Sequence, residues 1–255
     1  MDLAFTSEEQ AFRGMVRDWV TANLPKDIAA KVHGAQRLHR EDMQRWAKIL
    51  GAKGWLGYSW PETFGGPGWS AVQKHLFEEE CALAGAPRVV PFGPVMVAPV
   101  IRAFGNAEQQ SRFLPGIASG DVWWSQGYSE PGAGSDLASL KTFAADDGDE
   151  WVINGQKIWT SFGEVADYCY LICRTSNDGP PHAGISEIIV PMNTPGIDVR
   201  PIQDMTTNRH FCEVFYTDVR VPKANLVGKQ GGAFAQTMRQ LEHERGGIDR
   251  LVSNK

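Results

Sequence analysis

The spacing of apolar residues changes character twice along this chain, and that change constrains the fold more than any single motif does. From residue 1 to about 120, apolar residues recur at helical spacing, as at Val16 and Val20. Beyond that point, short β-branched and aromatic runs alternate with Gly and Pro, which is typical of strands separated by turns. The sequence therefore predicts an α+β fold, with an N-terminal helical domain (1–120), a central β-barrel or sandwich-like domain (121–230) and a further helix (231–255).

Local signals predict where individual elements begin and end. Thr6 or Ser7 is expected to cap the first helix, because Glu9 or Gln10 follows three residues later as the partner of a capping box. In the middle region, Trp151–Gly155 is expected to form a strand that enters an Asn-Gly hairpin turn.

The composition bounds the class of protein. A chain of 255 residues with 42% hydrophobic and 22% charged residues can bury a sizeable core. A net charge of -5 offers no basic surface for nucleic acid, and no apolar run reaches the roughly 18 residues of a membrane-spanning helix. The N-terminal segment, residues 1–5, lacks the basic start and apolar centre of a signal peptide, so a cytoplasmic location is expected by default.

Neither the cysteines nor the histidines follow a metal-binding pattern. Cys81, Cys169, Cys173 and Cys212 show no C-x-x-C spacing and are expected to be reduced core residues. The segment His243–Gly247 has the first two residues of the zinc motif H-E-x-x-H but not its second His. No metal site is therefore expected.

Two segments of the middle region carry the strongest signal for a ligand. Ser129–Asp136 reads Ser-Glu-Pro-Gly-Ala-Gly-Ser-Asp, and Lys157–Ser161 reads Lys-Ile-Trp-Thr-Ser. The first forces an irregular turn in which backbone without Cβ atoms can approach a ligand closely. In the second, Trp159 offers a flat apolar face beside two hydroxyl groups, which suits a ring with polar edges. Together the segments predict a flavin cradle.

Two other interpretations of these segments exist. A Gly-Pro turn before a β-hairpin is common in proteins, and Trp159 would then be an ordinary core residue. A nicotinamide site is less favoured, because the run after Pro131 lacks the third glycine of G-x-G-x-x-G and lies between strand-like segments.

Both segments resemble the acyl-CoA dehydrogenase family, whose flavin loop reads S/T-E-P-x-A-G-S-D and whose second flavin segment reads K-x-W-I/T-T/S. Trp60–Gly66 resembles the W-P-E-x-x-G-G segment of the same family. The resemblance runs from about residue 5 to residue 255 and implies FAD as cofactor. It also implies that the last helix begins a C-terminal helical bundle, which is truncated here.

The resemblance implies oxidation of an acyl-CoA thioester to a trans-2-enoyl-CoA, with a carboxylate removing the α-proton and FAD N5 accepting a hydride. Glu244 occupies the position of the base in the branched-chain and long-chain members, and Arg245 that of an Arg that contacts the CoA portion. On a helical projection, Glu244 lies at the edge of an apolar stripe formed by Phe234, Met238 and Leu241. The alternative is an ordinary surface Glu paired with Arg or Lys.

Carried over residue by residue, the resemblance gives roles to five further positions. Gln126 and Ser129 would contact the flavin, Ser161 would hydrogen-bond its N5 edge, and Trp159 would pack against the isoalloxazine ring. Ser135 would touch the pantetheine or phosphate region of the substrate. Gln126 stands where several members have an aromatic residue.

Other residues of these segments have supporting roles. Glu130 and Asp136 are expected to brace the loop, because an ionised carboxylate against a reduced, anionic flavin would be repelled. Gly246 and Gly247 are expected either to leave room for a bulky or branched acyl group beside the base or to permit a helix bend.

The resemblance also implies partners and a setting. An acyl-CoA substrate, an electron-transfer flavoprotein or similar electron acceptor, and a dimer or tetramer are expected, within lipid metabolism such as fatty acid β-oxidation. The rival interpretations are an acyl-CoA oxidase or flavin monooxygenase on the same fold, and a truncated or non-catalytic subunit of a heteromeric dehydrogenase.

Overall fold

The structure, a computed structural model, describes residues 4–246, without the side chains of 239, 240 and 242–246. The described chain divides into two compact units. The helical unit comprises the residues up to Val95, Ala118–Asp121 and the described residues from Glu242 on, and the sheet unit comprises Met96–Ile117 and Val122–Leu241. Helices and a sheet are both present, so the predicted α+β class is confirmed.

The helical unit is built on amphipathic helices whose ends are set by local sequence. Thr6 caps the first helix: the Glu9 amide donates to Thr6 Oγ1 at 3.2 Å, and the Thr6 amide donates to Glu9 Oε2 at 2.8 Å, which confirms the expected capping box. The helices are α1 (Ser7–Asn23), α2 (Lys26–His33), α3 (Arg40–Lys53), η1 (Glu62–Phe64) and α4 (Ala71–Leu83).

A buried carboxylate ties α1 to α4. Glu80 on α4 accepts from Arg13 Nε at 2.5 Å and from Arg17 Nε at 2.8 Å, so the charge buried on one helix is compensated by two guanidinium groups of the other. Apolar side chains of α1, α3 and α4 form the core beside it, among them Val20 and Trp46.

A glycine allows the segment Ala118–Asp121 to lie against α3. A Cβ on Gly51 would be 2.4 Å from the carbonyl oxygen of Ser119, so only glycine permits this approach. Lys48 of α3 also pairs with Asp121 at 2.8 Å. These contacts explain why this short segment belongs to the helical unit.

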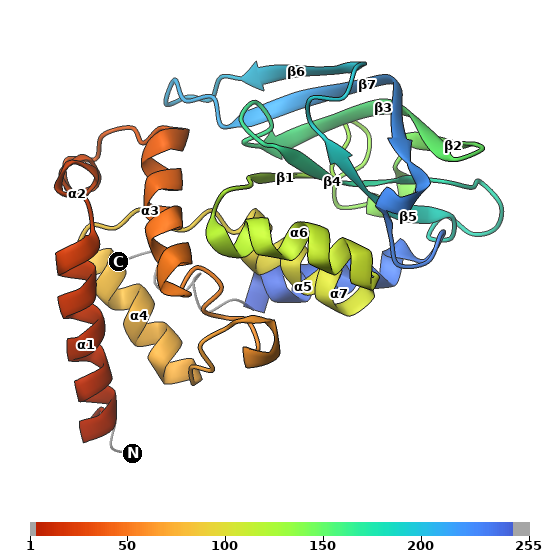
Figure 1. Cartoon of the computed structure of the whole chain (residues 1–255). Helices are drawn as coiled ribbons and strands as arrows, with labels where there is room; N and C mark the ends of the chain where they lie inside the picture. The colour runs from red at the N-terminus through yellow and green to blue at the C-terminus, as the bar shows by residue number, and fades with distance from the viewer. Residues whose placement is uncertain (1–3, 247–255) are drawn as a thin grey trace. The chain divides into compact units, whose positions relative to one another are not determined.

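The sheet unit contains one connected sheet of eight strands in the order β6-β7-β3-β2-β4-β5-β8, with β1 added parallel to β4 (Figure 1). Figure 1 shows α5, α6 and α7 gathered beside β1, β4 and β5. The strands are β1 (Trp124–Gly127), β2 (Phe143–Asp147), β3 (Glu150–Ser161), β4 (Tyr168–Arg174), β5 (Ile185–Pro191), β6 (Ile197–Ile202), β7 (Phe211–Pro222) and β8 (Leu226–Val227). The helices are η2 (Phe92–Val97, which begins in the helical unit), α5 (Ala98–Phe104), α6 (Ala107–Ser119), η3 (Leu137–Ser139), η4 (Lys223–Asn225) and α7 (Ala233–Gly246), and the last residues of α6 and α7 belong to the helical unit.

Strand burial follows the sequence pattern. The near-continuous apolar runs in β4 and β5 are buried on both faces, whereas β7 alternates, with Cys212, Val214 and Tyr216 buried. Cys169 and Cys173 are buried free thiols on β4, as expected.

The expected Asn-Gly hairpin turn is wrong. β3 continues through Asn154 and Gly155, and the register against β7 shifts between Ile153 and Gly155, which marks a bulge. A Cβ on Gly155 would lie 2.5 Å from Thr142 Oγ1, so glycine is needed here for a close approach and not for a turn. The two-residue connection between β2 and β3 contains Gly148, at φ 66°.

The expected apolar stripe is not the side of α7 that the sheet unit buries. Ala233, Gln236 and Thr237 are buried there, whereas Met238 is exposed. Gln236 and Thr237 face the sheet because they donate hydrogen bonds to the buried carboxylate of Glu187 on β5.

Across residues 4–246, no helix combines the length and the apolar character that crossing a bilayer requires. Among the side chains that the structure describes, no cluster of three or more His, Cys, Asp or Glu could hold a metal ion.

Candidate functional site

The two ligand-signal segments lie side by side in the sheet unit. β1 leads through Tyr128 into the loop, and the carbonyl of Ser129 accepts a hydrogen bond from the amide of Ile158 at 2.9 Å. Glu130 and Ala133 then exchange backbone hydrogen bonds of 2.8 and 3.1 Å, which closes the turn. The hydrogen bond to Ile158 therefore places the loop directly beside the strand that carries Trp159.

A fully buried ion pair braces this loop. Lys157 Nζ lies 2.9 Å from Glu130 Oε1 and donates to the carbonyl of Tyr128 at 2.9 Å. Glu130 also accepts from the amides of Lys141 at 2.6 Å and Thr142 at 2.9 Å. The bracing role expected for Glu130 is thus confirmed, whereas the side chain of Asp136 is exposed.

The protonation of this pair follows from its surroundings. Burial raises the pKa of Glu130, but Lys157 and the two amides outweigh it, and the pKa lies below its usual value. Burial lowers the pKa of Lys157, although the Glu130 carboxylate opposes this. The buried pair of Lys157 and Glu130 therefore holds the loop in place, whereas a solvent-exposed ion pair would stabilise it only weakly.

Trp159 is presented to the outside by a strained backbone. Its φ is 60°, and the register between β3 and β7 shifts between Lys157 and Thr160. The indole is 56% exposed, and its edge contact with Phe211 has a centroid distance of 6.0 Å. Phe162 also has a positive φ, of 57°. Bulky residues in the left-handed region are uncommon and cluster at functional sites. The alternative of a core Trp159 is wrong.

Neither the packing nor the backbone conformation of the described chain requires glycine at two positions of the loop, Gly132 and Gly134. A Cβ on Gly132 or Gly134 would meet nothing within 4 Å, and neither residue has a positive φ. Glycine at these positions is explained if a ligand approaches the backbone. With the open face of Trp159, these glycines fit a large, flat, phosphorylated cofactor such as FAD.

The other expected contacts are distributed as follows. Gln126 on β1, Ser129 in the loop and Ser161 at the end of β3 are half-buried, and Ser135 is exposed. The structure brings Ser129 next to Ile158, the neighbour of Trp159. The side chains of Glu244 and Arg245 lie outside the described part of the chain.

Sequence reasoning missed the buried polar residues behind this surface. Glu187 lies on β5 with no exposed surface and binds four donors, one of them the hydroxyl of Tyr128. Burial raises the pKa of Glu187, and its hydrogen bonds only partly offset this. The signal was an acidic residue inside the apolar run Ile185–Val190. Lys157 was recognised only as part of a motif.

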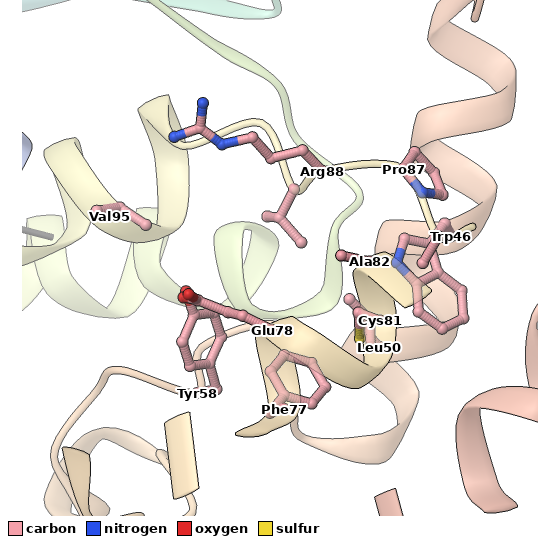
Figure 2. A pocket seen from close by; sticks show the side chains of 12 residues that line it. Trp46, Leu50, Tyr58, Phe77, Glu78, Cys81, Ala82, Pro87, Arg88 and Val95 are labelled. Atoms are coloured by element: carbon pink, nitrogen blue, oxygen red, sulfur yellow. The ribbon is translucent and has the colours of Figure 1, made fainter. Parts of the chain in front are cut away.

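The helical unit contains a separate cavity of about 190 Å³ (Figure 2). Its walls are largely apolar, and the Tyr58 hydroxyl donates to Glu78 at one side. Figure 2 shows Trp46 and Cys81 on the opposite side. The residues lining it are Trp46, Leu50, Tyr58, Phe77, Glu78, Cys81, Ala82, Ala86, Pro87, Arg88, Val89 and Val95. None of the expected site residues lines this cavity.

Comparison with known families agrees with the motifs. Residues 6–121 match the family description "Acyl-CoA dehydrogenase, N-terminal domain", and residues 125–219 match "Acyl-CoA dehydrogenase, middle domain". The chain belongs to the acyl-CoA dehydrogenase family. The resemblance stated from the loop and Trp159 motifs is therefore confirmed.

Two relatives in this family are named acyl-CoA dehydrogenases. The chain is 43% identical to acyl-CoA dehydrogenase IpdE1 of Mycobacterium tuberculosis, covering 93% of this chain and 63% of that protein. It is 41% identical to acyl-CoA dehydrogenase FadE26 of the same organism, covering 96% and 62%.

Solved structures of family members share the fold. A protein described as "Tcur3481-Tcur3483 steroid ACAD" matches with a TM-score of 0.85 and 41% identity, over 96% of this chain and 63% of that one. The ChsE4-ChsE5 complex from Mycobacterium tuberculosis matches with a TM-score of 0.83 and 38% identity, over 95% and 61%. The chain thus spans less than two thirds of the length of these acyl-CoA dehydrogenases.

Proposed function

We propose that this chain supplies the FAD site and the α-proton base of an acyl-CoA dehydrogenase that converts an acyl-CoA thioester to its trans-2-enoyl-CoA. The observation that carries the proposal is Trp159, an exposed indole held at a left-handed φ beside a loop braced by a buried ion pair. Bound FAD would supply a hydride acceptor for the β-carbon of the substrate.

The residues of this chain would bind and orient that cofactor. Trp159 would cover one face of the ring, while Gln126, Ser129 and Ser161 would contact its polar edges. Gly132 and Gly134 leave room for the ligand at the loop backbone.

The substrate contacts and the base are proposed from the family resemblance. Ser135, exposed in the loop, would contact the CoA portion together with Arg245. Glu244 would remove the α-proton, a step that needs a carboxylate with a raised pKa in a water-poor setting. The domain bounds 1–120, 121–230 and 231–255 likewise remain a prediction.

The relatives support a bulky acyl group and a second subunit. One solved relative is described as a "steroid ACAD" and another as the ChsE4-ChsE5 complex. We therefore place this chain in a heteromeric dehydrogenase for polycyclic acyl-CoA, with electrons passing to an electron-transfer flavoprotein or similar acceptor.

The cofactor part is tested by titrating purified protein with FAD and following flavin absorbance and fluorescence. Trp159→Ala should raise the FAD dissociation constant about 2- to 12-fold, the range expected for loss of one aromatic stacking contact. Leu83→Ala is the matched control, since it removes an exposed apolar side chain from α4. A wild type that binds no FAD, or equal affinity in Trp159→Ala, would refute the site.

The base is tested separately, in protein that reduces its flavin on addition of acyl-CoA. Glu244→Gln should slow flavin reduction about 10²- to 10⁴-fold while FAD binding stays unchanged. Near-normal reduction in that variant would remove Glu244 from the mechanism.

A further inference from the structure

Glu187 is a buried carboxylate that receives four hydrogen bonds from separate parts of the sheet unit. Its Oε1 accepts from the Tyr128 hydroxyl at 3.0 Å and from Thr237 Oγ1 at 2.9 Å. Its Oε2 accepts from the Tyr170 hydroxyl at 2.5 Å and from Gln236 Nε2 at 2.8 Å. Each oxygen therefore has two donors, which is the usual capacity of a carboxylate oxygen.

This arrangement differs from an ordinary buried ion pair. Among the described residues, no Lys, Arg or His forms an ion pair with Glu187. Its sequence neighbours Ile185, Ile188 and Ile189 are fully buried aliphatic residues, so the carboxylate interrupts an otherwise apolar strand. Burying a carboxylate without a cation is costly unless hydrogen bonds replace its hydration. The buried carboxylate at position 187 is explained if the protein needs one group there that accepts four hydrogen bonds.

One of the four donors, Tyr128, leads to the flavin loop. Tyr128 is held at both ends, because its hydroxyl binds Glu187 and its carbonyl accepts from Lys157 Nζ at 2.9 Å. The next residue is Ser129, whose carbonyl binds the Ile158 amide beside Trp159. A shift of the Tyr128 side chain would thus directly displace the adjoining loop.

Two other donors, Gln236 and Thr237, lead to helix α7. Gln236 and Thr237 lie in its first two turns, and the helix continues to Gly246. Position 244 lies seven positions after Thr237, which is close to two full turns, so the two positions share one side of the helix. A rotation of the first turns about the helix axis would rotate position 244 by the same angle.

We propose that Glu187 is a positioning residue whose carboxylate fixes the flavin loop, through Tyr128, to helix α7, through Gln236 and Thr237. One acceptor then sets both the loop that would hold the cofactor and the rotation of the helix that carries the base. The catalytic meaning of this link rests on the proposed function, whereas the link itself is a property of the sheet unit.

The link predicts that a change at one end is transmitted to the other. Hydrogen exchange is measured on the full chain for two sets of amides, those of 128–133 and those of 234–241. Thr237→Val should speed exchange in the loop as well as in α7, and Tyr128→Phe should likewise speed exchange in α7 as well as in the loop. Each rate should rise by about 10- to 100-fold, as expected for loss of a hydrogen bond to a charged group. Tyr216→Phe is the control, since it removes a buried hydroxyl of the same sheet that contacts Cys169 and not Glu187.

The flavin provides a second readout that general destabilisation would not move. In protein loaded with FAD, Thr237→Val should shift the flavin absorption bands although Thr237 has no assigned contact with FAD, and Tyr216→Phe should leave them unchanged. Exchange changes confined to the substituted element, or equal changes in the control, would overturn the positioning role. If wild type binds no FAD, the proposed function fails, and the exchange result alone upholds or overturns the link.

Discussion

Substitution of Lys157 by Met tests the electrostatics that support the loop. The Lys157 side chain has no exposed surface, and that of Glu130 is 6% exposed, so the variant leaves a buried carboxylate without its cation. Removing one partner of a buried pair typically costs about 3–5 kcal/mol of unfolding free energy. At about 2–4 °C per kcal/mol for chains of this size, the melting temperature should fall by roughly 6–20 °C.

The assay is urea and thermal unfolding followed by circular dichroism, with a surface lysine as control. Lys223 pairs with Asp146 at 2.5 Å, but the two side chains are 36% and 57% exposed. Lys223→Met should therefore cost no more than about 1 kcal/mol.

A double variant separates the charge effect from lost packing. In Lys157→Met combined with Glu130→Gln, no ionised group of the pair remains buried, so much of the lost stability should return. A Lys157→Met protein within about 1 kcal/mol of wild type, or a double variant as unstable as the single one, would refute this account of the brace.

Three further outcomes can be measured. Burial raises the folded-state pKa of Glu187 above the usual 4.5. The contribution of this group to stability is therefore full at pH values below 4.5 and is lost as pH rises through the raised pKa. In urea unfolding across this pH range, stability should fall more steeply in wild type than in Glu187→Gln. Gly66→Ala should lower the stability of the helical unit by about 1–3 kcal/mol or more, because the new Cβ would lie 1.8 Å from the Trp60 carbonyl oxygen. Gly14→Ala in α1 should instead raise the stability by about 0.5–1 kcal/mol, because a Cβ there meets nothing within 4 Å. Gly134→Ala should leave the melting temperature unchanged and weaken FAD binding.

Each of these outcomes has an opposite that would count against its reasoning. Parallel pH slopes for wild type and Glu187→Gln would mean that this carboxyl has the same pKa in the folded and unfolded states. Equal melting temperatures for the Gly66 and Gly14 variants would show that the close approach to Trp60 relaxes without cost. Unchanged FAD affinity in Gly134→Ala would mean that the ligand does not approach this part of the loop.

Features that depend on nearby residues could be predicted from the sequence. The capping box of Thr6 and Glu9 lies within one helical turn, and the helix and strand regions follow from periodicity. The loop and Trp159 motifs likewise identified the family. In each case the interacting groups are close in the sequence, so local pattern carries the information.

Features that depend on distant partners could not be predicted. Asn154-Gly155 has the local signature of a turn, but pairing with β7 and the close approach of Thr142 select a bulge. Glu187 looked like an isolated charge in an apolar strand, because its donors Tyr128 and Thr237 lie 59 and 50 residues away in the sequence. Burial of such a group is decided by tertiary contacts alone.

The convergence of four donors on Glu187 also has an evolutionary consequence. Replacing the carboxylate by an apolar residue in a single step would remove the Glu187 acceptor from two tyrosine hydroxyls, a threonine hydroxyl and a glutamine amide, all of them buried. Each of the reverse single steps would remove a donor from a buried charge. The five positions are therefore expected to change as a set, so that homologues lacking an acid here carry phenylalanine or aliphatic residues at the positions of Tyr128 and Tyr170, and lineages that acquired this network would rarely lose it.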